Sequence, residues 1–283
     1  MIRTLAECPS APRVVLVHPG ALPATVHQDL AAALGTLHVV DLEQLPAYRR
    51  MMVTGEQDGL SVAGLAESAA EQLRAAGLLH GPWLLAGWSV GGVVGYALTE
   101  LLAEHQLPAH LVLLDSIAPA RGYRRSREDF TAEVLLPWFV TYLAAKRGGR
   151  LSLPGKRFRG MDTETGLRLV LAAGIDSGLL WPDTTLAGLR KVYEVYLHGL
   201  FRNVGLTSAH RAGAARVPIT LVRPENGLID TADPLGWQRL ATDLRVLRCP
   251  GDHYSMLRDP VTVALVARLT RQLLPTPMTA RSA

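Results

Sequence analysis

Short apolar runs alternate with longer amphipathic stretches along most of this chain. Runs of this kind, bounded by glycine, proline or polar residues, predict buried strands, and the amphipathic stretches predict helices. The alternation predicts an α/β fold, in which a mostly parallel sheet carries helices on both faces. The predicted strands are Arg13–His18, Leu37–Leu42, Trp83–Ala86, His110–Asp115, Pro218–Arg223 and Leu244–Cys249. The predicted helices are Val26–Leu34, Ser61–Ala76, Val90–Glu104 and Pro260–Leu274.

The alternation is interrupted between Ser116 and Val217. This interval is far longer than an ordinary connection between two strands, so it must contain structure of its own. Two stretches within it, Leu135–Ala145 and Leu189–Phe201, have the pattern of helices. We therefore expect residues 116–217 to form a helical lid, inserted into a single domain of residues 1–283.

The composition indicates a globular protein with a substantial core. Of the 283 residues, 48% are hydrophobic and 19% are charged, whereas disordered chains have fewer apolar residues and a higher net charge. No apolar run after Met1 is long enough for a signal peptide, and none approaches the roughly 20 residues of a membrane helix. Cys8 and Cys249 are far apart and indicate neither a disulfide framework nor a zinc site. We expect a cytoplasmic protein that binds no metal and no membrane.

The net charge of +4 is mild, but basic residues gather between positions 121 and 159. This segment lacks a recognition helix and a stacking motif, so we expect no nucleic-acid partner. A solvated face is the simplest interpretation, and docking of an acidic protein partner is the second. The basic residues are Arg121, Arg124, Arg125, Arg127, Lys146, Arg147, Arg150, Lys156, Arg157 and Arg159, against the acids Glu128, Asp129 and Glu133.

One short motif carries chemistry. The sequence Gly87-Trp88-Ser89-Val90-Gly91 has the form GxSxG and stands between a predicted strand and a predicted helix. That context is typical of a nucleophile elbow, the sharp turn that exposes the serine of an α/β-hydrolase. Glycine suits both ends of the motif, because side chains there would collide with neighbouring elements. We expect Ser89 to be a nucleophile and the Val90 amide to face the developing oxyanion.

A nucleophilic serine needs a base, and in this fold the chain order is serine, acid, histidine. His253 lies on a loop just after the last predicted strand, at the edge where the catalytic groups of an open α/β sheet gather. A purely structural histidine is the alternative. The other histidines after the motif fall on a helix, at the start of a strand or in the insertion: His105, His110, His198 and His210.

Two places could supply the acid. Asp115 ends a strongly apolar strand, where an unpaired carboxylate would be costly unless a partner such as an imidazole N–H were present. Glu225 and Asp230 stand in a later polar stretch, where acids need no special explanation. The expected burial favours Asp115.

Four blocks of the sequence resemble the type I thioesterase domains that terminate nonribosomal peptide and polyketide synthases. The blocks are GPWLLAGWSVGG, AHLVLLDSIAP, PLGWQRL and CPGDHYSML, and the resemblance runs from about Arg13 to Leu257. It implies an α/β-hydrolase fold with a helical lid between the acid and the next strand.

The resemblance also implies roles for single residues. In type I domains the acid follows the strand after the elbow, which matches Asp115. Their oxyanion hole uses the residue after the nucleophile, matching Val90, and a residue after the first central strand, matching Ala21. Stand-alone editing (type II) thioesterases usually carry the acid after the later strand, where Glu225 and Asp230 are the candidates.

The implied activity is release of an acyl, peptidyl or polyketide chain from a carrier protein through an acyl-Ser89 intermediate. Release occurs by hydrolysis or macrocyclisation, with the substrate on a phosphopantetheine arm and no cofactor of the enzyme's own. The acyl or peptidyl carrier protein is the partner expected on the basic 121–159 region. In the lid, Trp138, Phe139, Tyr142 and Leu143 either line an acyl pocket or form the lid's own small core.

Three other functions are compatible with the same residues. They are an editing thioesterase, a general serine esterase or lactonase, and a catalytically silent α/β-hydrolase that only binds a ligand. Silent relatives tend to lose a member of the triad, and here all three candidates are present. The silent alternative is therefore the least favoured.

Overall fold

The structure is a computed structural model that describes residues 1–54 and 59–274. Its centre is a seven-stranded sheet in the order β1-β3-β2-β4-β5-β6-β7. All neighbouring strands are parallel except β1, which runs antiparallel to β3 at the edge. The predicted strands are all present, and the mostly parallel sheet is confirmed. The strands are β1 (Ile2–Ala6), β2 (Arg13–His18), β3 (Leu37–Asp41), β4 (Trp83–Trp88), β5 (His110–Leu114), β6 (Ile219–Asn226) and β7 (Leu244–Asp252).

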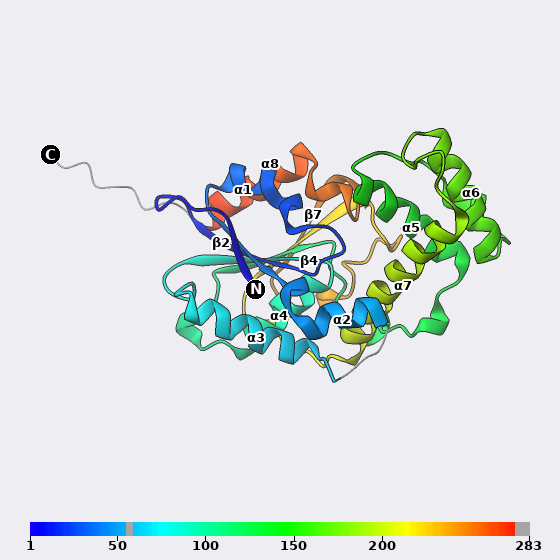
Figure 1. Ribbon diagram of the computed structural model, residues 1–283. Helices are drawn as coiled ribbons and strands as arrows, with labels where there is room; N and C mark the ends of the chain where they lie inside the picture. Colours follow the sequence, from blue (N-terminus) through cyan, green and yellow to red (C-terminus); the bar gives the residue numbers. More distant parts are fainter. Residues whose placement is uncertain (55–58, 275–283) are drawn as a thin grey trace.

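Helices cover both faces of the sheet (Figure 1). On one face lie α1 (Gln28–Leu34) and α8 (Pro260–Leu273), and on the other lie α3 (Val62–Ala75) and α4 (Val90–Leu101). A further helix, α2 (Pro46–Thr54), was not predicted. Short 3₁₀ turns occupy residues 24–27, 42–44, 104–106, 121–123, 127–129, 155–158, 237–239 and 255–257.

The core lies on both sides of the sheet, which explains why the strands are apolar without alternation. In β2, Val14 and Leu16 point to the core under α1 and α8, whereas Val15 and Val17 point to the core under α3 and α4. All four side chains are 1% exposed or less. The sheet is thus held from both faces, and the loops at its carboxyl edge are left to form a site.

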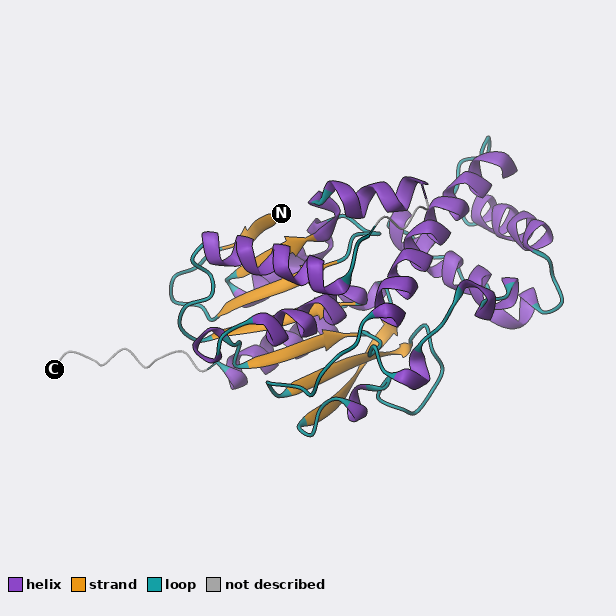
Figure 2. Ribbon diagram, turned by 90° about the horizontal axis from the view of Figure 1, so that it is seen from below, coloured by secondary structure: helices purple, strands orange, loops and turns teal. Residues whose placement is uncertain are grey.

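Three helices fill the interval between β5 and β6: α5 (Ala132–Arg147), α6 (Thr163–Asp176) and α7 (Leu186–Ala209). They stand beyond one end of the sheet (Figures 1 and 2). Two of them were predicted, and α6 was not. The expected helical insertion is therefore present, while its extent over 116–217 and the single domain of 1–283 stay predictions.

Within residues 1–54 and 59–274, the structure contains no helix that is both long enough and apolar enough to cross a membrane.

Candidate active site

Ser89 lies at the turn between β4 and α4, with a φ of 55° and a ψ of −132°. A positive φ is strained for a residue with a side chain, and such strain concentrates at functional sites. The Ser89 N–H donates to the Leu114 carbonyl at 3.0 Å, which ties the turn to β5. The glycines of the motif have no room for a side chain. A Cβ at Gly87 would lie 2.5 Å from the Cα of Gly92, and one at Gly91 would overlap the backbone of Val17.

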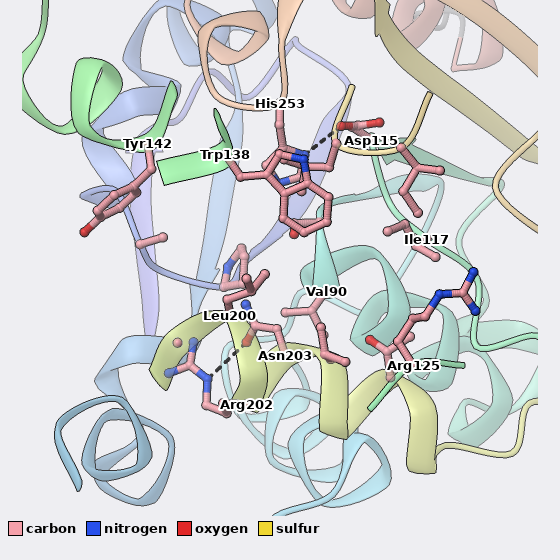
Figure 3. A pocket seen from close by; sticks show the side chains of 18 of the residues that line it. Val90, Asp115, Ile117, Arg125, Trp138, Tyr142, Leu200, Arg202, Asn203 and His253 are labelled. Carbon is pink, nitrogen blue, oxygen red and sulfur yellow. Dashed lines mark hydrogen bonds and ion pairs between the residues drawn. The ribbon is translucent and has the colours of Figure 1, made fainter. Parts of the chain in front are cut away.

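His253 and Asp115 come together from the ends of two strands. Asp115 follows β5, His253 follows β7, and both side chains are buried. The Asp115 Oδ2 lies 2.7 Å from the His253 Nδ1 (Figure 3). Because a carboxylate can only accept, the hydrogen stands on Nδ1 and the neutral ring presents Nε2 as an acceptor. That tautomer is the one a general base requires.

Two further contacts hold this pair. The Asp115 N–H donates to the Val222 carbonyl at 2.9 Å, and Asp115 has a positive φ of 43°. The Trp88 indole N–H donates to the His253 carbonyl at 3.0 Å, and the two rings lie 5.2 Å apart between centroids. The residue beside the candidate nucleophile therefore also positions the candidate base.

The alternative acids and bases lie elsewhere. Glu225, at the end of β6, and Asp230 are exposed, and neither bonds to His253. Asp230 does line the cavity described below. Among the other histidines, His105 is exposed, His110 is bonded to Thr220, His210 faces Glu100, and His198 lies on α7.

The two backbone amides expected to bind an oxyanion differ in their hydrogen bonding in this structure. Val90 lines the same cavity as Ser89. Because Val90 is the first residue of α4, its N–H has no partner within the helix. The Ala21 N–H, in contrast, donates to the Glu43 carboxylate at 3.2 Å. Ala21 has a positive φ of 70°, and its carbonyl accepts from Lys146 at 3.2 Å. The Ala21 amide is thus occupied by a carboxylate, a feature that the sequence did not indicate.

Ser89, Asp115 and His253 all line one cavity of about 400 Å³. Its far wall comes from the lid, where Trp138 and Tyr142 line it (Figure 3). The expectation that Phe139 and Leu143 also line this pocket is wrong. On α5, Phe139 and Leu143 each follow a cavity-lining residue by one position, and both side chains are buried in the hydrophobic core. The Phe139 ring packs 4.9 Å from that of Tyr193 on α7.

The aromatic wall of the cavity is uncharged. Burial raises the pKa of Tyr142, and burial together with the neighbouring Tyr254 raises the pKa of Tyr196 well above its usual value. Their hydroxyls therefore stay protonated at neutral pH. This part of the cavity therefore presents aromatic rings that carry no charge, which favours apolar groups.

A buried histidine pair lies behind the elbow and was not predicted. The His18 Nε2–H donates to the Leu22 carbonyl at 2.8 Å, so its Nδ1 accepts from the His27 Nε2 at 3.0 Å. The His18 ring stacks on Trp88 at 5.6 Å. The remaining His27 nitrogen, Nδ1, is buried without a hydrogen-bond partner. Burial, followed by the charge of His18, lowers the pKa of His27 well below its usual 6.5.

This pair predicts a pH-dependent stability. His27 stays neutral when folded but takes up a proton when unfolded, so stability is highest above about pH 6.5 and falls as the pH drops below it. The fall reaches about 1.4 kcal/mol per pH unit for one such group. We expect His27→Gln, which can still donate to His18, to reduce the loss of melting temperature between about pH 7.5 and about pH 5.5. The exposed His105→Gln is the control, and an unchanged loss in His27→Gln would refute this account.

Within the part of the chain that the structure describes, no group of three or more His, Cys, Asp or Glu side chains is arranged to hold a metal ion. The side chains that line the cavity include the hydroxyl of Ser89, the imidazole of His253 and the carboxylate of Asp115.

The fold is that of an α/β-hydrolase, and comparisons with known proteins show what the chain resembles. The family model described as Thioesterase domain matches residues 12–145. This segment includes Ser89 and Asp115 but ends before α6, α7 and His253. Residues 12–145 are therefore similar to a thioesterase domain.

One curated relative matches over a short segment. The thioesterase pynI of Aspergillus niger is 44% identical over 43 residues, which is 15% of this chain and 15% of that protein.

Solved structures match over nearly the whole chain. A four-domain nonribosomal peptide synthetase, bound to AMP and glycine, is 24% identical with a TM-score of 0.65, and the match covers 98% of this chain and 20% of the synthetase. The NocB thioesterase domain, in a covalent complex with a fluorophosphonate nocardicin G analogue, is 23% identical with a TM-score of 0.60. This match covers 97% of this chain and 100% of the NocB domain. The Vlm2 thioesterase domain is 19% identical with a TM-score of 0.55, and the match covers 96% of this chain and 97% of the Vlm2 domain. The solved structures confirm the fold that the resemblance implies, and the family model agrees with the resemblance over residues 12–145.

Proposed function

We propose that this protein releases acyl, peptidyl or polyketide chains from the phosphopantetheine arm of a carrier protein through an acyl-Ser89 intermediate. The observation that carries the proposal is the 2.7 Å hydrogen bond between Asp115 and His253, because both residues line the same cavity as Ser89. The position of this acid, directly after β5, supports a chain-releasing rather than an editing enzyme. The thioesterase domain and the synthase domains of the same fold support the substrate class.

The first half of the reaction forms the acyl-enzyme. His253 Nε2 takes the proton of the Ser89 hydroxyl as Oγ attacks the thioester carbonyl carbon. The Val90 amide stabilises the tetrahedral oxyanion, and Ala21 adds a second amide once its bond to Glu43 is exchanged. The carbon–sulfur bond then breaks, and the leaving sulfur takes the proton from His253 Nε2.

The second half releases the chain. A water molecule, or a hydroxyl or amine at the other end of the acyl chain, attacks the Ser89 ester with His253 again removing its proton. The bond between the acyl carbon and Ser89 Oγ then breaks, and His253 returns the proton to Oγ. Water gives the free acid, and an internal nucleophile gives a lactone or lactam. The uncharged aromatic wall of the lid favours a folded apolar chain over bulk water.

The exposed basic residues of the lid offer a docking surface for the carrier protein. Arg121, Arg147 and Arg150 are exposed, and Arg125 lies both at the surface and on the cavity. An acidic carrier would be attracted to this region, and its arm would then enter beside Arg125.

The test compares an acyl-pantetheine thioester with the oxygen ester of the same acyl chain. We expect release of the pantetheine thiol to exceed hydrolysis of the oxygen ester in kcat/KM, because a thiolate leaves the tetrahedral intermediate more readily than an alkoxide. Cleavage of the oxygen ester with no cleavage of any thioester would assign the site to a general esterase instead.

A further inference from the structure

The cavity wall contains a buried arginine that forms no ion pair with an acid in the described part of the chain. Arg202, on α7, is 3% exposed and lines the cavity. It takes part in none of the ion pairs formed within residues 1–54 and 59–274. Burial of a charge without a counter-charge is costly. The position of Arg202 therefore calls for a negative group that comes from outside the chain.

The guanidinium is fixed in place by neutral groups. Its Nη1 donates to the Tyr48 carbonyl at 3.0 Å, and its Nε donates to the Asn203 Oδ1 at 3.0 Å. The Tyr48 ring lies 3.6 Å from the guanidinium carbon, a cation–π contact. The Tyr48 hydroxyl also approaches the Asn203 Oδ1 at 3.1 Å. Because donors converge on Oδ1, the orientation of the Asn203 amide is set.

Two adjacent donors remain without a partner. The Arg202 Nη2 and the Asn203 Nδ2 form no hydrogen bond with any residue in the described part of the chain. Both residues line the cavity, and Figure 3 shows them together on α7, joined by their hydrogen bond. A guanidinium N–H beside an amide N–H suits a group with two oxygens and one negative charge, namely a carboxylate.

We propose that Arg202 and Asn203 bind a carboxylate of the acyl chain, so that the preferred substrate is an acyl thioester with a free carboxyl group. This inference rests on the proposed function, because it names the acyl class released at the same cavity. The aromatic side chains Trp138 and Tyr142 contact the apolar part of such a chain. Arg125 is less suited, because it is exposed and its Nη1 already donates to backbone carbonyls.

A phosphate of the pantetheine arm would offer similar charge, and the choice of substrate separates the two sources. Thioesters of N-acetylcysteamine carry no phosphate, so any charge preference seen with them comes from the acyl chain. The test therefore uses N-acetylcysteamine thioesters of dicarboxylic acids of increasing length, each paired with the uncharged methyl-ended chain of equal length.

For the wild type, we expect at least one chain length at which the carboxylate substrate has about tenfold or higher kcat/KM than its uncharged partner, the size of a charge-assisted hydrogen bond. Arg202→Met should abolish this preference, so that the two thioesters of each pair have the same kcat/KM to within about threefold. Asn203→Asp places a carboxylate beside Arg202 and should abolish the preference by a different route, without deleting the buried arginine. Lys191→Met removes an exposed cation from the same helix and is the control for net charge.

The outcomes separate this inference from the proposed function. Turnover of uncharged thioesters with no carboxylate preference at any chain length would overturn the inference and leave the proposed function standing. A preference that survives in both Arg202→Met and Asn203→Asp would overturn it as well. Absence of turnover for every thioester would instead count against the proposed function.

Discussion

Replacing Ser89 by alanine is expected to lower thioester turnover by about four to six orders of magnitude, the range seen when a nucleophile that acts with its base is removed. The hydroxyl is the only group on the elbow that can attack the carbonyl, and alanine leaves the turn and its oxyanion amide unchanged. The measurement is kcat/KM for an acyl-pantetheine thioester, with thermal unfolding to verify the fold.

A second serine of the same cavity gives the control for this substitution. Ser208 lines the cavity, and its hydroxyl is bonded to the backbone of Arg125 rather than placed on the elbow. Ser208→Ala should retain most of the turnover. A folded Ser89→Ala protein that turns over thioesters at a rate near that of the wild type would end the nucleophile hypothesis.

Replacing Asp115 by asparagine is expected to lower kcat by about 10⁴-fold. The amide keeps the shape of the side chain but loses the charge that stabilises the imidazolium. The asparagine amide can also donate a hydrogen bond to His253 Nδ1, which favours the tautomer with the hydrogen on Nε2. In that tautomer Nε2 cannot accept the serine proton. Turnover under single-turnover conditions measures the effect on the chemical step.

Glu225→Gln and Asp230→Asn are the matched controls for Asp115→Asn, because each replaces an exposed acid by its amide. Both should retain turnover within about threefold. If Asp115→Asn stays active while one of these variants loses activity, the acid has been assigned to the wrong strand, and the editing type of thioesterase becomes the better description.

The central sheet and the contact between Asp115 and His253 could be predicted because local pattern and chemistry agree there. Each parallel strand is buried on both faces, so it reads as a continuous apolar run. The glycines around Ser89 have a steric cause that is visible in the motif itself. Asp115 was singled out by a physical argument about a carboxylate at the end of an apolar strand, and its buried partner is indeed His253.

Two of the elements that were missed, β1 and α2, lack such signals. β1 is an edge strand whose exposure does not alternate regularly. In α2, the buried side chains among those that the structure describes are Tyr48 and Met51. For α6 a signal was available, because the Asp162 side chain caps the helix by accepting from the Thr165 N–H. In a single sequence, however, an aspartate can be recognised as a cap only after a helix has been predicted to follow it.

Contacts between distant segments were beyond any local pattern. The stripe of α5 that faces the cavity, with Trp138 and Tyr142, differs by one residue from the stripe that faces α7, with Phe139. Which stripe meets the cavity depends on how the lid is rotated on the sheet. The bond between Ala21 and Glu43 likewise depends on the tertiary fold, since it joins two separate loops.

The most direct test of the central claim is the intact mass of the protein after rapid mixing with an acyl-pantetheine thioester and an acid quench. The account predicts a wild-type species heavier by the mass of the acyl group, with peptide mapping placing the acyl group on Ser89, and no such species in Ser89→Ala. Full thioester turnover with the acyl group on another residue, or an equal adduct in Ser89→Ala, would contradict it.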